Sequence, residues 1–265
     1  MRRRGQRLTR CVRSCTDTDT ASHTASPIVF LPEKHHTPVM VRAAHLKPFT
    51  KSLGMQPSTP TFADRRIPLG LRDEYVRVGD HIAYFWETPR EFCEAIRFLE
   101  VGLEQDEFCV IFGHTEANRR VSELLAERGY DCTRLEAEGR LAIVPGQTTG
   151  AHILSTIDHV FTTALERGTT LIRLLGNIGW GHHGWPAEKQ LLEFEARVTG
   201  AAKQFPCVVV CMYDVSALSG GVILHGAFET HPLTFFRNIV RTNSQYVDVD
   251  EFVGRLREDD MAQSG

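Results

Sequence analysis

The stretch Gly79–Phe92, GDHIAYFWETPREF, decides how the chain folds. It begins with a mostly apolar run, His81–Trp86, which is typical of a β-strand. Thr88-Pro89-Arg90-Glu91 follows, with a threonine that can cap a helix, a proline in the first turn and a glutamate three residues after the cap. The segment predicts a strand that runs straight into a helix. Nucleotide-binding proteins place a phosphate loop at such a turn, but residues 86–91 supply neither glycine nor lysine.

Downstream of this stretch, short apolar runs alternate with segments of helical period, which indicates βαβ units. Helical spacing predicts one helix over residues 153–165 that stops at Gly168, and another from Pro186 to about Lys203. The expected fold class is α/β, a three-layer sandwich with a largely parallel central sheet. The expected strands are His81–Trp86, Phe108–Phe112, Arg140–Val144, Thr170–Leu175, Cys207–Tyr213 and Phe235–Val240.

Charge is unevenly distributed along the 265 residues. Residues 1–70 carry 12 Lys and Arg against 4 Asp and Glu, whereas the remainder carries 18 against 29. The acidic body is therefore not expected to bind nucleic acid directly or to attract an anionic membrane. Residues 1–70 are poor in apolar residues, so we expect a disordered basic extension there. The folded domain is expected over residues 71–258, followed by a flexible tail over residues 259–265.

The cysteines and apolar runs bear on the compartment. Seven cysteines without regular spacing indicate free thiols in a reducing environment, so a cytoplasmic location is expected. The longest apolar run near the N-terminus, residues 28–31, is too short for a signal peptide. No stretch of the sequence reaches the roughly 20 apolar residues of a membrane span, so no membrane association is predicted.

A second glycine-rich segment, GNIGWGHH at residues 176–183, has the glycine spacing of a phosphate loop. His182 and His183 stand where that loop requires a lysine and a hydroxyl residue, and solvent exposure is the favoured interpretation of both. The preceding run also lacks a terminal aspartate that could hold magnesium. ATPase activity is therefore not expected, and no cofactor is predicted.

Six segments, in order, resemble a known family over about residues 75–258. They are GDHIAYFWETPREFCEAIRFLEVGLEQDEFCVIF, RLLGNIGW, LLEFEARV, VVVCMYDVSAL, ETHP and NSQYVDVDEFVGRLR. The family is the MEDS domain, the methanogen/methylotroph, DcmR-type sensory domain. The resemblance implies a relative of the RecA/KaiC fold that has lost its phosphate loop. It also implies a bacterial sensor of small organic molecules, hydrocarbon derivatives among them, that acts in signalling and transcription control.

The candidate ligand-binding residues lie in these segments and near strand ends. Open parallel sheets bind ligands beyond the carboxyl ends of their strands, so Trp86, Trp180 and Tyr213 are expected to line one pocket there. Histidine, carboxylate and thiol groups are candidates for its polar wall. The full set of candidates is His81, Tyr84, Trp86, Arg173, Trp180, Glu195, Cys211, Tyr213 and His231.

Several polar candidates also have a structural interpretation. Cys207 and Cys211 share one face of a strand but lie about 13 Å apart, too far to bind one metal ion together, so no metal site is predicted. The two histidines, at positions 81 and 231, can be hydrogen-bonded structural residues. Glu195 is either solvated on the surface of its helix or paired with a histidine or an arginine, of which Arg173 is one candidate.

Two functions remain open at this stage. The first is a non-catalytic sensory module that binds a small organic ligand and relays the change to a protein partner, either a transcription regulator or a kinase. The alternative is a metal- or thiol-dependent hydrolase or transferase that uses Cys211 with His81 or His231. Convergence of these three side chains in an accessible crevice would favour the enzyme, whereas scattered or sealed positions would disfavour it.

Overall fold

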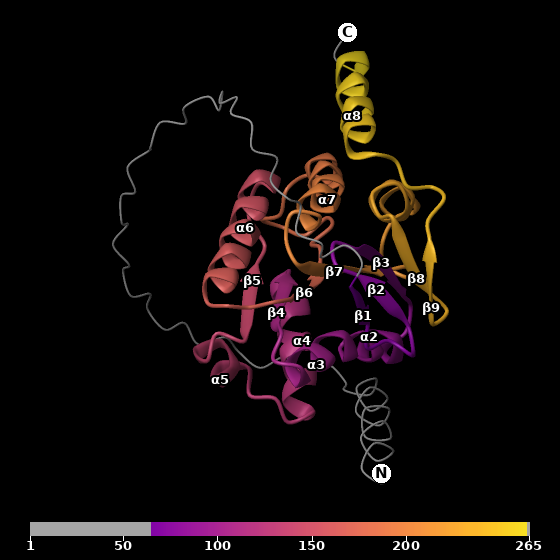
Figure 1. Cartoon of the computed structure of the whole chain (residues 1–265). Coiled ribbons are helices and arrows are strands. Elements are labelled where there is room, and N and C mark those ends of the chain that lie inside the picture. The colour runs from indigo at the N-terminus through magenta and orange to yellow at the C-terminus, as the bar shows by residue number, and fades with distance from the viewer. Residues whose placement is uncertain (1–64, 264–265) are drawn as a thin grey trace, which may run out of the picture.

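A seven-stranded sheet forms the centre of the protein, in a computed structural model that describes residues 65–263 (Figure 1). The strand order is β5-β4-β6-β7-β3-β8-β9, and within the described residues the neighbouring strands run parallel except for the pair β8 and β9. The strands are β3 (His81–Trp86), β4 (Phe108–Gly113), β5 (Leu141–Pro145), β6 (Ile172–Asn177), β7 (Cys207–Asp214), β8 (Leu233–Phe236) and β9 (Ile239–Thr242).

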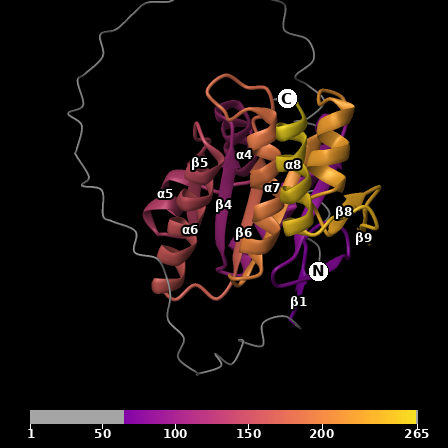
Figure 2. The same ribbon diagram turned by 90° about the horizontal axis from the view of Figure 1, so that it is seen from above.

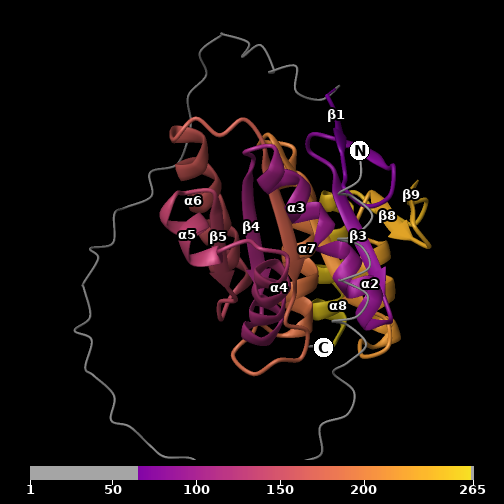
Figure 3. The same ribbon diagram turned by 90° about the horizontal axis from the view of Figure 1, so that it is seen from below.

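Helices cover both faces of this sheet. One face carries α2 (Pro89–Ala95), α3 (Arg97–Glu104), α4 (Thr115–Glu127) and α5 (Cys132–Ala137), as seen from below in Figure 3. The other face carries α6 (Gly150–Glu166), α7 (Glu188–Ala202), α8 (Val249–Gln263) and the π-helix η1 (Val222–Phe228), and α8 lies beside α7 in Figure 2. The expected α/β class with a largely parallel central sheet is confirmed. None of the described helices combines the length and the apolar character needed to cross a bilayer.

The central strands are buried on both sides, because each face of a parallel sheet is covered by helices. Residues of β7 alternate between two apolar clusters. Cys207, Val209, Cys211 and Tyr213 pack toward α6 and α7, whereas Val208, Val210 and Met212 pack toward α2–α4. This alternation decides which polar side chains of neighbouring strands can meet.

The turn after β3 has the predicted strand-to-helix geometry. Thr88 caps α2, and the carboxylate of Glu91 accepts hydrogen bonds from the backbone N–H groups of Glu87 and Thr88 at 2.9 and 3.0 Å. The start of a helix offers free N–H groups and a positive dipole end, which is what a bound phosphate requires. Here Glu91 takes the N–H groups of the two residues before the helix, Thr88 takes the N–H of Glu91, and Pro89 has none, so few N–H groups remain for a phosphate.

The folded body extends beyond both of the expected domain boundaries. A hairpin of β1 (Arg66–Pro68) and β2 (Tyr75–Arg77) precedes β3, and Ile67 and Leu69 are buried in the cluster under α2–α4. Residues 66–70 are therefore part of the body, upstream of the boundary expected at residue 71. The disorder expected for residues 1–64 lies outside the described residues. At the other end α8 continues to Gln263, past the expected domain end at residue 258.

The run Phe235–Val240 does not form one strand as predicted. It is divided into β8 and β9, which pair antiparallel around Arg237 and Asn238. These two residues have φ values of 49° and 66°, and a two-residue hairpin turn needs positive φ at both of its central positions. The prediction was wrong because an arginine gives little indication of such a turn.

Leu69→Ala should lower the free energy of unfolding by about 2–5 kcal/mol, because it leaves a cavity where a fully buried side chain now packs. Urea unfolding of the full chain measures this change. Leu224→Ala is the matched control, since Leu224 is 49% exposed, and its effect should stay within about 0.5 kcal/mol. Equally small losses in both variants would mean that the segment before β2 does not join the core.

Candidate functional site

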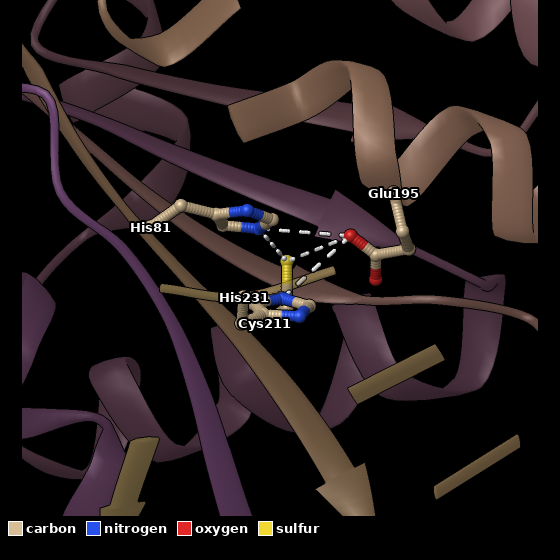
Figure 4. Close-up of side chains that lie close together, drawn as sticks. All are labelled: His81, Glu195, Cys211 and His231. Carbon is tan, nitrogen blue, oxygen red and sulfur yellow. Dashed lines mark hydrogen bonds and ion pairs between the residues drawn. The ribbon is translucent and has the colours of Figure 1, made fainter. Parts of the chain in front are cut away.

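Four ionisable side chains meet between the sheet and α7, as Figure 4 shows. They are His81, Glu195, Cys211 and His231, which we call the buried cluster. Each of them is at most 3% exposed, and one potential ligand atom from each lies within 4.8 Å of those of the other three. A buried polar group without a hydrogen-bond partner destabilises the folded state, so each donor and acceptor in the cluster needs a partner.

The fold brings these side chains together from four separate segments. β3 and β7 are parallel neighbours with Ala83 opposite Cys211, and strand alternation turns His81 and Cys211 to the same face. Glu195 lies on the buried face of α7, one turn before Thr199. His231 comes from the turn between η1 and β8.

The distances inside the buried cluster are short. His81 Nε2 lies 3.3 Å from Cys211 Sγ and 3.6 Å from Glu195 Oε2. Glu195 Oε2 also lies 3.6 Å from Cys211 Sγ and 3.8 Å from His231 Nε2. One carboxylate oxygen therefore faces the thiol and both imidazoles.

The hydrogen bonds around His81 decide which of its nitrogens carries the proton. The hydroxyl of Thr199 donates to the carbonyl oxygen of Thr230 at 2.8 Å, so its oxygen is left to accept. His81 Nδ1 lies 2.8 Å from that oxygen and donates to it. The proton is therefore on Nδ1, and Nε2 turns a lone pair toward Cys211 and Glu195.

His231 is held in the same tautomer by a different set of groups. Its Nδ1 lies 3.0 Å from the carbonyl oxygen of Ala227, which can only accept, so Nδ1 carries the proton. The hydroxyl of Thr230 donates to the carbonyl of Gly226 and leaves its oxygen as a second acceptor for this N–H. His231 Nε2 has no hydrogen-bond partner and faces Glu195.

Tyr213 joins the carboxyl group to the π-helix. Its hydroxyl lies 2.8 Å from Glu195 Oε1 and 2.7 Å from the carbonyl oxygen of Gly226. A single hydroxyl proton cannot serve both acceptors, whereas a protonated Glu195 can donate to the tyrosine oxygen while the tyrosine donates to Gly226. Burial raises the pKa of Glu195 to about 8, with hydrogen bonds from Tyr213 and Cys211 opposing the rise.

Burial also keeps the other members of the cluster uncharged. It lowers the pKa of His81 well below its usual range, with the neighbouring His231 adding to the effect, and lowers the pKa of His231 to about 3. The pKa of the Cys211 thiol is raised well above its usual range, first by burial and then by Glu195. The cluster is therefore neutral as it stands, and its thiol is not an activated nucleophile.

An apolar cavity of about 480 Å³ reaches this cluster at Cys211. It lies between α6 and α7 over strands β4, β6 and β7. Its walls include Phe112, Phe161, Leu174, Phe194, Val209 and Cys211, and the exposed side chains of Ser155, Asp158, Arg197 and Gln204 stand at its edge. A cavity of this size suits a small organic molecule.

Five of the nine predicted residues come together: His81, Glu195, Cys211, Tyr213 and His231. Trp180 lies beside them, with its ring 6.4 Å from that of Tyr213, and is 8% exposed. Exposed positions are observed for His182 and His183, as predicted.

Three predicted residues lie on the opposite face of the sheet. Tyr84 and Trp86 belong to the cluster under α2–α4, so Trp86 does not share a pocket with Trp180 and Tyr213 as expected. Arg173 also turns away from Glu195 and pairs with Glu107 instead. The expected pocket at the carboxyl edge of the sheet is replaced by the cavity beneath α6 and α7.

Sequence reasoning did not identify Thr199, Thr230 or Gly226. Thr199 stands four residues after Glu195, and helical spacing could have revealed that the two share a face. Thr230 and Gly226 act through a π-helix, whose position no periodicity in the sequence indicates.

Tyr213→Phe should lower the free energy of unfolding by about 1–3 kcal/mol, because it removes the hydroxyl that links Glu195 to Gly226 in a buried site. Chemical denaturation of the full chain tests this. Tyr75→Phe is the control at an exposed tyrosine and should change stability by less than about 0.5 kcal/mol. No difference between the two variants would contradict the hydrogen-bond network described above.

Comparison with known proteins assigns the chain to a family. Residues 80–232 match the family described as MEDS, MEthanogen/methylotroph, DcmR Sensory domain, and this range contains all four residues of the buried cluster. The transcriptional repressor DcmR of Methylorubrum extorquens (strain DSM 6343 / CIP 106787 / DM4) is 23% identical over 158 residues, which are 59% of this chain and 59% of the repressor. Since the family match covers more than half of the chain, this protein belongs to the MEDS family of sensory domains.

Proposed function

We propose that this protein is a non-catalytic sensor that binds a small, mostly apolar organic molecule and relays its presence to a protein partner. The observation that carries the proposal is the apolar cavity of about 480 Å³ that ends at Cys211. Membership of a sensory-domain family and similarity to a transcriptional repressor support a regulatory role. On this basis the partner is a transcription regulator or a signalling kinase.

The walls of the cavity suggest how such a ligand is recognised. Aromatic and aliphatic side chains supply most of the contact, at roughly 25 cal/mol for each Å² of apolar surface removed from water. The polar side chains at the edge, among them Ser155 and Gln204, can orient one polar group of the ligand. The ligand class that fits is a hydrocarbon derivative with an apolar body and at most one or two polar atoms.

The position of α7 connects the cavity to the rest of the domain, so ligand binding can change the packing of other elements. This helix forms one wall of the cavity, carries Glu195 of the buried cluster, and packs against α8 and η1. A ligand changes the conformational equilibrium only if it binds one arrangement better than another. A molecule that fills the space between α6 and α7 favours the arrangement in which these two helices stand apart, and α8 carries that preference to the surface.

A metal- or thiol-dependent hydrolase or transferase is the second candidate, and the convergence of Cys211 with both histidines is the observation that favours it. The burial of both histidines argues against it, since neither has exposed surface and only Cys211 of the three borders the cavity. A thiol whose pKa is raised by burial is also a weak nucleophile at neutral pH. The sensor therefore accounts better for the geometry.

We also infer that the domain is a relative of the RecA/KaiC fold without nucleotide binding. Support comes from the position of β3 inside the parallel sheet, between β7 and β8, with the strand-to-helix turn at its carboxyl end. Glu91 takes the N–H groups of Glu87 and Thr88 at that turn, and Pro89 at the start of the helix has no N–H to offer a phosphate. On this inference, nucleotides are not the signal that the domain detects.

Gly200→Leu should abolish the response to small apolar ligands without weakening the fold. Gly200 lines the cavity, and a side chain built there meets open space, so a leucine can occupy the ligand's volume. Replacing a glycine inside a helix should also stabilise the chain by about 0.5–1 kcal/mol. The measurement is the rise in melting temperature that benzene, cyclohexanol and indole produce in each variant.

Gly254→Leu is the matched control. Gly254 lies in α8, a side chain there also meets open space, and the residue does not line the cavity. This variant should gain the same intrinsic stability and keep the ligand response of the unaltered chain. Equal responses in both variants would place ligand binding elsewhere, and a loss in both would point to a general effect of the new leucine.

A further inference from the structure

We propose that the buried cluster is a zinc site, in which His81 Nε2, His231 Nε2, Cys211 Sγ and Glu195 Oε2 bind one Zn²⁺ ion. This inference goes beyond the sensory role and does not depend on it. Four kinds of observation carry it: the spacing of the four atoms, the shortage of protons among them, the groups that hold them, and their chemical type.

The spacing matches that of a tetrahedral site. With metal–ligand bonds of about 2.0–2.3 Å, neighbouring ligand atoms in a tetrahedron stand about 3.3–3.6 Å apart. Four contacts in the cluster measure 3.3, 3.6, 3.6 and 3.8 Å. All four atoms lie within 4.8 Å of one another. The rings of His81 and His231 lie against each other, with centroids 3.8 Å apart, so binding one ion at the centre requires these two rings to move apart.

The lone pairs in the cluster outnumber the protons that could satisfy them. Both imidazoles turn an unprotonated Nε2 inward, and Glu195 Oε2 and Cys211 Sγ face the same space. The thiol has one proton, which can serve His81 Nε2 at 3.3 Å, and His231 Nε2 is left without a partner. Buried acceptors without donors are rare in folded proteins, and a cation at this position satisfies all four.

The surrounding groups orient the ligands as partners of a metal site do. Histidines that bind a metal almost always donate their other ring N–H to a neighbouring oxygen, which fixes the tautomer and the ring. His81 donates to Thr199 and His231 to the carbonyl of Ala227. Glu195 Oε1 is held by Tyr213, which leaves Oε2 for the ion.

The chemical type of the ligands favours zinc. Two imidazoles, one thiolate and one carboxylate are each common ligands of Zn²⁺, whereas magnesium and calcium prefer sites made of oxygen atoms alone. Four protein ligands complete a tetrahedron and leave no position for water or substrate. Together with the burial of all four residues, this indicates an ion that holds β3, β7, α7 and the turn before β8 together.

Zinc binding has a defined proton balance. The hydrated ion loses its water ligands, and the Cys211 thiol releases its proton so that the thiolate sulfur can form the bond. Glu195, which is neutral in the metal-free cluster, likewise releases its proton, after which the Tyr213 hydroxyl donates to the carboxylate. No oxidation or reduction is involved.

The test uses the full chain, unfolded in denaturant with a chelator and then refolded with or without Zn²⁺, because the four ligand residues are at most 3% exposed in the folded state. We expect one zinc ion per chain by elemental analysis after dialysis. At a free Zn²⁺ concentration about a hundredfold above Kd, the melting temperature should rise by about 5–10 °C relative to the metal-free chain. Less than one fifth of an equivalent of zinc, with no rise in melting temperature, would overturn the proposal.

Cys211→Ser and Cys207→Ser form a matched pair of variants. Both cysteines are buried on the same face of β7, but only Cys211 belongs to the cluster. Refolding with Co²⁺ adds a spectroscopic test, since a thiolate ligand gives a charge-transfer absorption. The Cys207→Ser variant should keep this absorption and the bound metal, and the Cys211→Ser variant should lose the absorption while circular dichroism shows that it still folds. If the Cys211→Ser variant kept the absorption and the bound metal as the Cys207→Ser variant does, the metal would be bound elsewhere.

Thr199 is proposed as a positioning residue that acts through His81. Thr199→Val removes the acceptor for His81 Nδ1 and should weaken zinc binding about 10- to 100-fold, whereas Thr199→Ser keeps the hydroxyl and should restore the affinity. Competition with a zinc chelator measures both affinities. If valine and serine give the same affinity, the tautomer of His81 is not held by Thr199 and this part of the proposal is wrong.

Discussion

The desolvation of Glu195 is the constraint around which this half of the structure is organised. A carboxyl group with no exposed surface lies between α7 and the sheet, and burial raises its pKa to about 8 even though hydrogen bonds from Tyr213 and Cys211 oppose the rise. Its partners come from β3, β7 and the segment after η1, which are far apart in the sequence. These elements therefore cannot shift independently, because a displacement of one would leave a buried polar group of another without its neighbour.

Local patterns were sufficient to predict most of the fold. β3 was predicted with its observed bounds, and the cap at Thr88 and the end of α6 near Gly168 follow from residue types within one turn of chain. The segments that were predicted differently depend on distant contacts or rare backbone conformations. Residues 66–70 are ordered because they pack under α2–α4, and the run Phe235–Val240 is divided by a turn that needs positive φ at an arginine.

The site was predicted in part, and strand alternation explains why some of the predicted residues lie on the other face of the sheet. Tyr84 and Trp86 lie three and five positions after His81, so they point to the opposite face of β3, and these odd offsets could have been seen in the sequence. The convergence of Glu195 and His231 could not have been predicted from the sequence, because it depends on how α7 and η1 pack on the sheet. The prediction that no metal is bound rested on Cys207 and Cys211 as a pair, whereas the proposed ligands each come from a different segment.

The π-helix η1 makes the spacing of its residues as important as their identity. The carbonyls of Gly226 and Ala227, near its C-terminal end, accept the hydrogen bonds that hold Tyr213, Thr230 and His231. Each hydrogen bond of a π-helix spans five residues, one more than in an α-helix, so a π-helical turn contains an additional residue. Loss of a single residue from Val222–Phe228 would let the segment relax to an α-helix and turn these carbonyls by about 100° about the helix axis. Related chains that keep every polar residue of the cluster but lack that one residue would therefore hold Tyr213, Thr230 and His231 in different positions.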